Sequence, residues 1–130
     1  MGYFSKRQSC SSHVKLLAGQ KSEQLACTYL KQQGLRFMAR NFRVKIGEID
    51  LIMRDNDTIV FIEVRYRRSQ QFGGALQSID WRKQQRIIHT AQWFLLRHDN
   101  LVNWPCRFDV VTLSGKIEAP EICWLKNAFQ

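Results

Sequence analysis

Three carboxylates and one arginine alternate along two short β-rich segments of the chain. Glu48 and Asp50 fall within residues 47–53, and Glu63 and Arg65 fall within residues 58–66. Side chains alternate between the two faces of a strand, so the two charged residues of each segment share a face. Carboxylate oxygens suit Mg²⁺ or Mn²⁺, and such an ion activates water and polarises phosphate oxygens. One interpretation of the pattern is therefore a metal site that also takes phosphate oxygens and water.

The turn between the two segments determines which of these side chains face one another. The residues between them read Arg-Asp-Asn-Asp, which is strong turn chemistry. A tight turn centred on residues 56–57 pairs residues whose numbers sum to 113, so Asp50 lies opposite Glu63 and Glu48 opposite Arg65. Directly opposed side chains point to the same face. We therefore expect the four charged groups to project together.

Opposed carboxylates destabilise a sheet unless something neutralises them. One solution is a divalent metal ion between Asp50 and Glu63. The other is compensation by Arg65 and further cations, in which case the charged face is only an exposed salt-bridge ladder. The opposite face of the hairpin is aliphatic and should be buried beneath a helix; it comprises Ile49, Leu51, Val60, Ile62 and Val64.

Helical periodicity appears on either side of the three strands expected at residues 35–44, 49–53 and 58–66. Residues 20–33 form an amphipathic pattern that ends before Gly34, and residues 78–97 form a longer one that Ser78 can cap. Residues 107–113 predict a fourth strand and residues 122–125 a short last one. Glu23 lies in the first turn of the first helix. It could point toward the sheet or simply favour the helix dipole.

The order of these elements is α-β-β-β-α-β with a weak final strand. The short connections of the first three strands predict antiparallel pairing. The long helix between the third and fourth strands is a crossover, so the fourth strand should run parallel to its neighbour. This predicts an α/β fold with a mixed sheet flanked by helices.

The composition excludes several classes of protein. The chain has 130 residues, a formal charge of +9 and 45% hydrophobic residues, which is typical of one globular domain. No apolar run approaches the ~18 residues of a membrane span, and no secretory signal is apparent. The four cysteines are scattered, which predicts reduced, mostly buried thiols and a cytoplasmic location. We expect a mobile basic arm over residues 1–18 and a single domain over residues 19–130.

The excess of positive charge continues inside the expected domain. Polyanions bind such surfaces through counterion release, so nucleic acid, in particular DNA, is the expected partner. The alternative is a solvated basic surface, and charge alone does not separate nucleic acid from an acidic protein or membrane. The candidate nucleic-acid-binding residues are Arg43, Lys45, Arg67, Arg68, Arg82, Lys83 and Arg86.

The spacing of a larger set of residues resembles the YraN family of bacterial proteins. The set comprises Gly19, Glu23, Ala26, Gly34, residues 41–43, residues 47–52, residues 61–65, residues 72–73 and residues 107–110. That family is similar to Holliday-junction resolvases of the PD-(D/E)XK, restriction-endonuclease-like superfamily. The resemblance implies a restriction-endonuclease-like αβββαβ core, in agreement with the order derived from periodicity.

The resemblance also implies roles for individual residues. Asp50 and Glu63 would be the carboxylates that hold Mg²⁺ or Mn²⁺, and Glu23 would match an acidic residue on the first helix of resolvase-like members. The superfamily usually has lysine two positions after the second carboxylate, where this chain has Arg65. Arginine can stabilise charge on a phosphate but cannot act as a base. Lys83 could replace that lysine, but an ordinary solvated lysine is the favoured interpretation.

Two main functions follow from these observations. The first is a metal-dependent endonuclease for structured or branched DNA, with Glu23, Asp50, Glu63 and Arg65 as its catalytic residues. The alternative is a nucleic-acid-binding module of the same fold. In this module catalysis is impaired because Arg65 replaces the lysine of the motif. A protein-interaction role is a more distant third. A homodimer would suit two-fold symmetric substrates such as DNA junctions.

Overall fold

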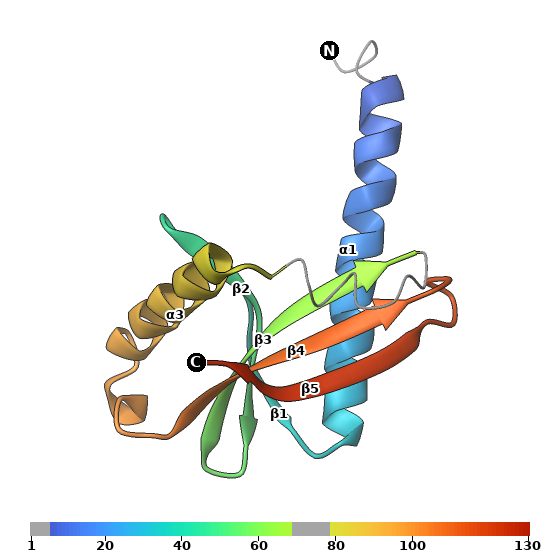
Figure 1. Ribbon diagram of the computed structural model, residues 1–130. Helices are drawn as coiled ribbons and strands as arrows, with labels where there is room; N and C mark the ends of the chain where they lie inside the picture. Colours follow the sequence, from blue (N-terminus) through green and yellow to red (C-terminus); the bar gives the residue numbers. More distant parts are fainter. Residues whose placement is uncertain (1–5, 69–78) are drawn as a thin grey trace.

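The structure is a computed structural model that describes residues 6–68 and 79–130, with side chains from residue 19 onward. Within these residues the structure has two α-helices, one short 3₁₀ helix and five strands (Figure 1). In chain order the elements are α1 (Lys6–Gln32), β1 (Arg36–Val44), β2 (Gly47–Asp55), β3 (Thr58–Arg67), α3 (Trp81–Leu96), the short 3₁₀ helix η1 (Asp99–Leu101), β4 (Cys106–Ser114) and β5 (Glu121–Phe129).

The five strands form one sheet in the order β1-β2-β3-β4-β5. Strands β3 and β4 are parallel, and every other neighbouring pair is antiparallel. The predicted order, mixed pairing and α/β class are therefore confirmed, and the architecture is consistent with a restriction-endonuclease-like core. The last strand is longer than the expected residues 122–125. Neither described helix is long and apolar enough to cross a lipid bilayer.

The boundaries of the helices differ from the sequence-based prediction at their amino ends. Helix α1 begins at Lys6, so the expected start near residue 20 is wrong and much of the predicted mobile arm is helical. The amino-terminal half of α1 extends beyond the sheet (Figure 1), which explains why no amphipathic period marks it. Helix α3 is capped by Asp80, whose Oδ1 accepts the Lys83 N–H at 2.9 Å. Ser78, the predicted cap, lies outside the described residues.

Helix α1 ends at the predicted position because Gly34 adopts a left-handed backbone conformation. Its φ of +100° is one that glycine reaches without strain. The N–H of Gly34 donates to the Lys31 carbonyl at 3.0 Å, and that of Leu35 donates to the Leu30 carbonyl at 3.1 Å. These bonds satisfy the last carbonyls of the helix and turn the chain into β1.

Of the described helices, α1 covers one face of the sheet and α3 covers the other. On the α1 side the core contains Ala26, Leu30, Leu51, Met53, Val60, Ile62, Val111 and Leu113. On the α3 side it contains Ile49, Ile52, Ile59, Phe61, Ile87, Ala91, Phe94 and Val110. The prediction of one aliphatic and one charged hairpin face is therefore only partly right. Both faces are apolar along most of the hairpin, and the carboxylates occupy only its open end.

Ile49 does not follow the alternation of side chains between the two faces of the strand. It packs in the α3-side core, although Leu51, two residues later, packs in the α1-side core. The start of β2 lies directly against α3: a Cβ at Gly47 would meet Thr90 Oγ1 at 3.0 Å. Pairing with β3 begins only at Leu51. The first residues of β2 therefore follow the helix surface, and Gly47 allows that close approach.

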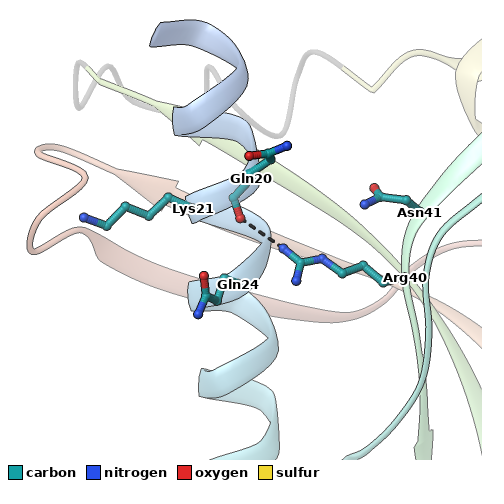
Figure 2. Close-up of a pocket in the computed structure, with 5 residues that line it drawn as sticks. All are labelled: Gln20, Lys21, Gln24, Arg40 and Asn41. Atoms are coloured by element: carbon teal, nitrogen blue, oxygen red, sulfur yellow. Dashed lines mark hydrogen bonds between the residues drawn. The ribbon is translucent and has the colours of Figure 1, made fainter. Parts of the chain in front are cut away.

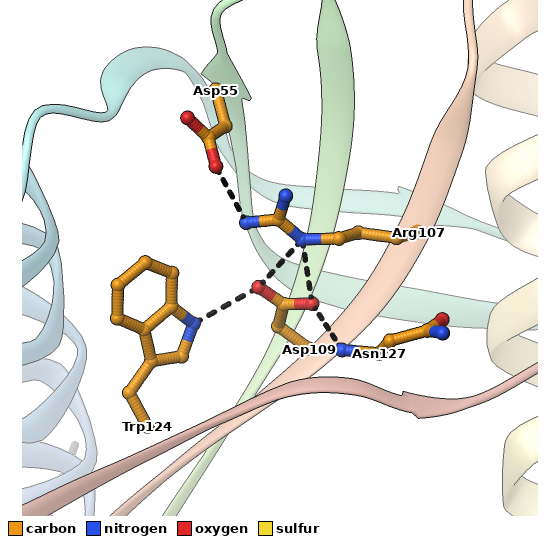
Figure 3. A network of polar contacts seen from close by, with 5 residues as sticks. All are labelled: Asp55, Arg107, Asp109, Trp124 and Asn127. Carbon is orange, nitrogen blue, oxygen red and sulfur yellow. Dashed lines mark hydrogen bonds and ion pairs between the residues drawn. The ribbon is translucent and has the colours of Figure 1, made fainter.

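A buried carboxylate on β4 holds the last strand, β5, in place (Figure 3). Asp109 is fully buried and accepts hydrogen bonds from Arg107 Nε at 3.1 Å, Trp124 Nε1 at 2.9 Å and the Asn127 N–H at 2.9 Å. Arg107 also pairs with Asp55 at 2.9 Å. The β4–β5 register shifts at this point, and Asn127 has a left-handed φ of 53°. Asp109 thus has a structural role.

The cysteines only partly match the prediction of buried thiols. Cys27 is buried in the α1-side core, whereas Cys106 and Cys123 are exposed, and all three are free. Although Cys106 is exposed as a residue, partial burial raises the pKa of its thiol. The side chain of Cys10 lies outside the described part of the structure.

Candidate active site

Asp50 lies where β2 and β3 separate. The two strands pair from Asp55 and Thr58 to Leu51 and Ile62, in the register that the turn predicted. At the next position the Asp50 carboxylate enters the gap, and its Oδ2 accepts the backbone N–H of Val64 at 2.8 Å. The side chain thus replaces a strand-to-strand hydrogen bond. This places a carboxylate in the plane of the sheet, at the open end of the β2–β3 hairpin.

Glu63 lies beside Asp50, as the sequence predicted, and the two residues line one cavity of about 200 Å³. Burial is the main cause that raises the pKa of Asp50 to about 8, and the negative charge of Glu63 adds to it. The hydrogen bond from Val64 acts in the opposite direction. Near neutral pH, Asp50 therefore keeps a proton unless a cation takes its place.

Two cations contact the Glu63 carboxylate, which is only 6% exposed. Lys83 Nζ lies 2.9 Å and Arg65 Nε 3.3 Å from its Oε2. The interpretation of Lys83 as an ordinary solvated lysine is therefore wrong. Sequence spacing does not show which side chains of α3 reach the sheet. Arg65 Nε is buried and makes no hydrogen bond of good geometry with the described residues.

Glu48 does not face Arg65 as predicted. It pairs instead with Arg43 of β1, with 3.1 Å between Oε2 and Nη2. The reason is that β2 has already left β3 at this position and is paired only with β1, where Arg43 and Glu48 are partners in the register. Both groups are largely exposed, so this ion pair contributes little to stability.

Glu23 reaches the site from α1, as the resemblance implied. It lines a second cavity of about 530 Å³ together with Glu48 and Asp50, and its Oε1 lies 3.8 Å from Arg40 Nε. Burial raises the pKa of Glu23, while hydrogen bonding to Asn41 and the charge of Arg40 act against that rise. The acidic site is therefore open on two sides, with Glu48 and Asp50 shared by both cavities.

Arg40 and Asn41 are neighbours of the site that the sequence analysis did not assign to it. They line a polar pocket between α1 and β1 with Gln20, Lys21 and Gln24 (Figure 2). Arg40 Nη2 donates to the Gln20 carbonyl at 3.1 Å and so connects β1 to the helix that carries Glu23. Asn41 has a left-handed φ of 53°, an uncommon conformation that asparagine tolerates. That residue type within a strand was the only sequence signal for this irregularity.

The donor set at the centre of the site consists of two carboxylates. Among residues 19–68 and 79–130, whose side chains are described, no three His, Cys, Asp or Glu side chains form a group that could hold a metal ion. Asp50 and Glu63 fit Mg²⁺ or Mn²⁺ nevertheless, because such ions commonly use one or two protein carboxylates and complete their shell with water and substrate phosphate. Glu23 is not one of these two carboxylates, but it lines a cavity together with Asp50.

The predicted nucleic-acid-binding residues fall into two groups. Lys83 and Arg86 line the cavity of Asp50 and Glu63, and Arg43 lines the cavity of Glu23. The others are exposed outside these two cavities: Lys45 in the β1–β2 turn, Arg67 and Arg68 at the end of β3, and Arg82 in the first turn of α3. The structure therefore brings three of the seven to the acidic site.

Comparison with known proteins identifies a family for this chain. The model of the uncharacterised protein family UPF0102 matches residues 22–113. A UPF0102 protein of Pseudomonas putida strain W619 is 54% identical over 114 residues, which cover 87% of this chain and 93% of the relative. A UPF0102 protein of Colwellia psychrerythraea is 52% identical over 112 residues, covering 85% and 87% of the two chains. The chain therefore belongs to the UPF0102 family, the family of YraN-like proteins that its residue spacing indicated.

Proposed function

We propose that this protein is a PD-(D/E)XK-type endonuclease that uses Mg²⁺ or Mn²⁺ to cleave structured or branched DNA. The observation that carries the proposal is the adjacent pair Asp50 and Glu63, in which burial and mutual repulsion raise the pKa of Asp50 to about 8. Such a pair is stable only when a proton or a cation neutralises it. A bound divalent ion supplies Lewis-acid polarisation of a phosphate oxygen and an activated water.

Lys83 and Arg65 provide the positive charge that this chemistry requires from the protein. The Lys83 ammonium is held 2.9 Å from Glu63, where it can donate a hydrogen bond to a water or to a phosphate oxygen in the cavity. Arg65 can stabilise the charge that develops on the phosphate but cannot exchange a proton. We therefore infer that Lys83, from α3, performs the role that the superfamily motif assigns to the position of Arg65.

Cations around the two cavities support nucleic acid as the substrate. Arg43, Lys83 and Arg86 line the cavities, and the chain carries a net charge of +9. Phosphate contacts of this kind position a duplex without reading its sequence. We expect binding with little sequence preference and an affinity that falls steeply as salt concentration rises. Equal affinity at low and high salt would contradict this expectation.

The second candidate function is a nucleic-acid-binding module without catalytic activity. One observation favours it: Arg65 and Lys83 both contact Glu63, so this carboxylate is neutralised without any metal ion. A site whose carboxylate is permanently paired would bind metal weakly. The basic surface would still bind nucleic acid.

One cleavage experiment separates these functions. Wild type, Asp50→Asn and Asp57→Asn are incubated with a four-way junction and a linear duplex of equal length, with Mg²⁺ or Mn²⁺. Asp57 lies exposed in the β2–β3 turn, so its variant is a matched control. Junction cleavage that disappears only in Asp50→Asn supports the endonuclease. Salt-dependent binding without cleavage supports the module, and the absence of both overturns the two proposals.

Metal binding can be tested independently of cleavage. A ligand that binds only the folded protein raises its stability, by about 2.7 kcal/mol at a concentration 100 times its Kd. We therefore expect Mn²⁺ to raise the Tm of the wild type and of Asp57→Asn, but not that of Asp50→Asn. The same rise in all three proteins would place the bound ion elsewhere.

A further inference from the structure

We propose that one flank of helix α3 binds an unpaired, single-stranded segment of the nucleic acid substrate, with Trp93 as a stacking surface for a base. The proposal rests on the proposed function for the class of partner, and it adds the form of substrate. The α3 flank consists of Arg82, Arg86, His89, Trp93 and Arg97.

The α3 flank is one continuous surface that begins at the acidic site. Its members recur at intervals of three or four residues, which places them on the same side of a helix. All five are exposed, whereas Ile87, Thr90, Ala91 and Phe94 form the buried side. Arg86 also lines the cavity of Asp50 and Glu63. A strand that leaves this cavity past Arg86 would therefore continue along the flank.

The charge of α3 is unfavourable for the helix itself. Of the flank residues, Arg82 lies in the first turn of the helix and Arg86 in the second, and the helix contains no Asp or Glu. A cation near a helix amino terminus faces the positive end of the helix dipole, which is unfavourable for the helix. Stability of the isolated helix therefore does not explain their placement. An anionic partner that runs along the flank does.

Trp93 gives the flank a surface that suits a base. Its side chain is 47% exposed. The Arg97 guanidinium lies 5.9 Å from the Trp93 ring centre and 5.7 Å from that of Phe42, so it is held between two aromatic rings beside the exposed indole. An aromatic ring next to an arginine is the usual arrangement in proteins that bind single strands, where bases stack and the cation meets the backbone.

The form of the partner follows from this geometry. A base can stack on Trp93 only if it is not already stacked and paired in a duplex, so the segment on the flank is single-stranded. Arg86 and Trp93 are seven residues apart in the sequence, which is about 10 Å along the helix axis. That length corresponds to only a few nucleotides of an unpaired strand. The flank thus fits a short unpaired arm next to the cleavage site.

Fluorescence anisotropy in EDTA tests the proposal without catalysis. The probes are a labelled oligothymidine and a labelled blunt duplex of the same length. We expect Trp93→Ala to weaken oligothymidine binding about tenfold or more, because stacking contributes that much per base. Duplex binding should change less than about twofold, since it depends on phosphate contacts. Trp93→Phe, which keeps an aromatic face, should restore most of the oligothymidine affinity.

The control is chosen to match the flank in chemistry but not in position. Lys126 lies 4.5 Å from the ring centre of Trp124 on β5, as Arg97 lies near Trp93, so Lys126→Gln is compared with Arg97→Gln. Only Arg97→Gln should weaken oligothymidine binding. Unchanged oligothymidine affinity in Trp93→Ala, or an equal loss for both probes, would overturn the inference.

The result is also independent of the proposed nuclease activity. If Trp93→Ala loses oligothymidine affinity selectively but the wild type cleaves nothing, the inference stands and the nuclease proposal falls. If the wild type cleaves junctions and Trp93→Ala binds oligothymidine normally, the nuclease proposal stands and this inference falls.

Discussion

The ammonium of Lys83 lies 2.9 Å from Oε2 of Glu63, joining the first turn of α3 to the centre of the acidic site. The backbone of the same lysine donates to the capping carboxylate of Asp80 at 2.9 Å. The cap therefore fixes the residue from which the ammonium extends. Helix α3 thus positions a cation at the carboxylates in addition to covering the sheet.

Replacing Lys83 should impair catalysis more than binding. In the proposed endonuclease, Lys83→Gln removes the ammonium beside Glu63, and loss of one such preorganised donor typically lowers kcat by about 10²- to 10³-fold. Arg82→Gln is the matched control, because it removes a neighbouring charge that is exposed and outside the cavity. Single-turnover cleavage and anisotropy measure the two effects. Equal losses of cleavage in both variants would reduce Lys83 to one of many phosphate contacts.

The variant Arg65→Lys should increase cleavage of branched DNA while leaving binding nearly unchanged. Both side chains carry a full positive charge, so the attraction to phosphate is kept. Arg65 Nε lies 3.3 Å from Glu63, and removal of its guanidinium takes away one of the two cations that compete with metal for this carboxylate. We expect slow cleavage by the wild type and a higher rate in the variant. A wild type that is robustly active and loses activity on this change would show that Arg65 is a working catalytic residue.

The raised pKa of Asp50 predicts how stability depends on pH. The pKa is 3.8 for an unperturbed group and about 8 in the folded protein, so the folded state binds more protons between these values. Stability should therefore be highest below pH 4 with respect to this group and fall as pH rises toward 8. Asp50→Asn cannot ionise, so it should be more stable than the wild type near pH 8, by more than about 1 kcal/mol, since one pKa unit corresponds to about 1.4 kcal/mol.

Urea unfolding at several pH values, without divalent metal, checks this prediction. The advantage of Asp50→Asn should shrink as pH falls toward 4. The exposed Asp57→Asn should show no such trend. A wild type as stable as Asp50→Asn at pH 8 would mean that the carboxylate pair is neutralised in another way, for example by the cations on Glu63.

The α1-side core should not tolerate charge. Ile62 of β3 is fully buried on the sheet face that α1 covers. Ile62→Asp should therefore lower the free energy of unfolding by more than about 4 kcal/mol and leave the domain unfolded. Val102 is 51% exposed, and Val102→Asp is the control, with an expected change within about 0.5 kcal/mol. Far-UV circular dichroism and thermal melts distinguish the two. A folded, cooperative Ile62→Asp protein would contradict the assigned packing.

The local pattern of the sequence predicted the elements and the hairpin register. The turn at residues 54–57 fixes which residues pair, and the structure keeps that register from Asp55 to Leu51. The period of two made Asp50 and Glu63 neighbours, and the crossover helix made β3 and β4 parallel. These features depend on interactions between residues close in sequence or on general rules of chain connection. Such interactions can be inferred without a three-dimensional structure.

Tertiary packing decided the rest of the site. Nothing in the spacing of α3 shows that Lys83 contacts Glu63, because the rotation of a helix against a sheet depends on how whole surfaces pack. The start of β2 leaves β3 and follows α3. For this reason Ile49 packs in the α3-side core and not with Leu51, and Glu48 pairs with Arg43 and not with Arg65. The sequence thus determined which chemical groups are present and most of their strand register. The packing of α1 and α3 on the sheet determined which of those groups meet, since contacts between distant segments exist only once the chain has folded.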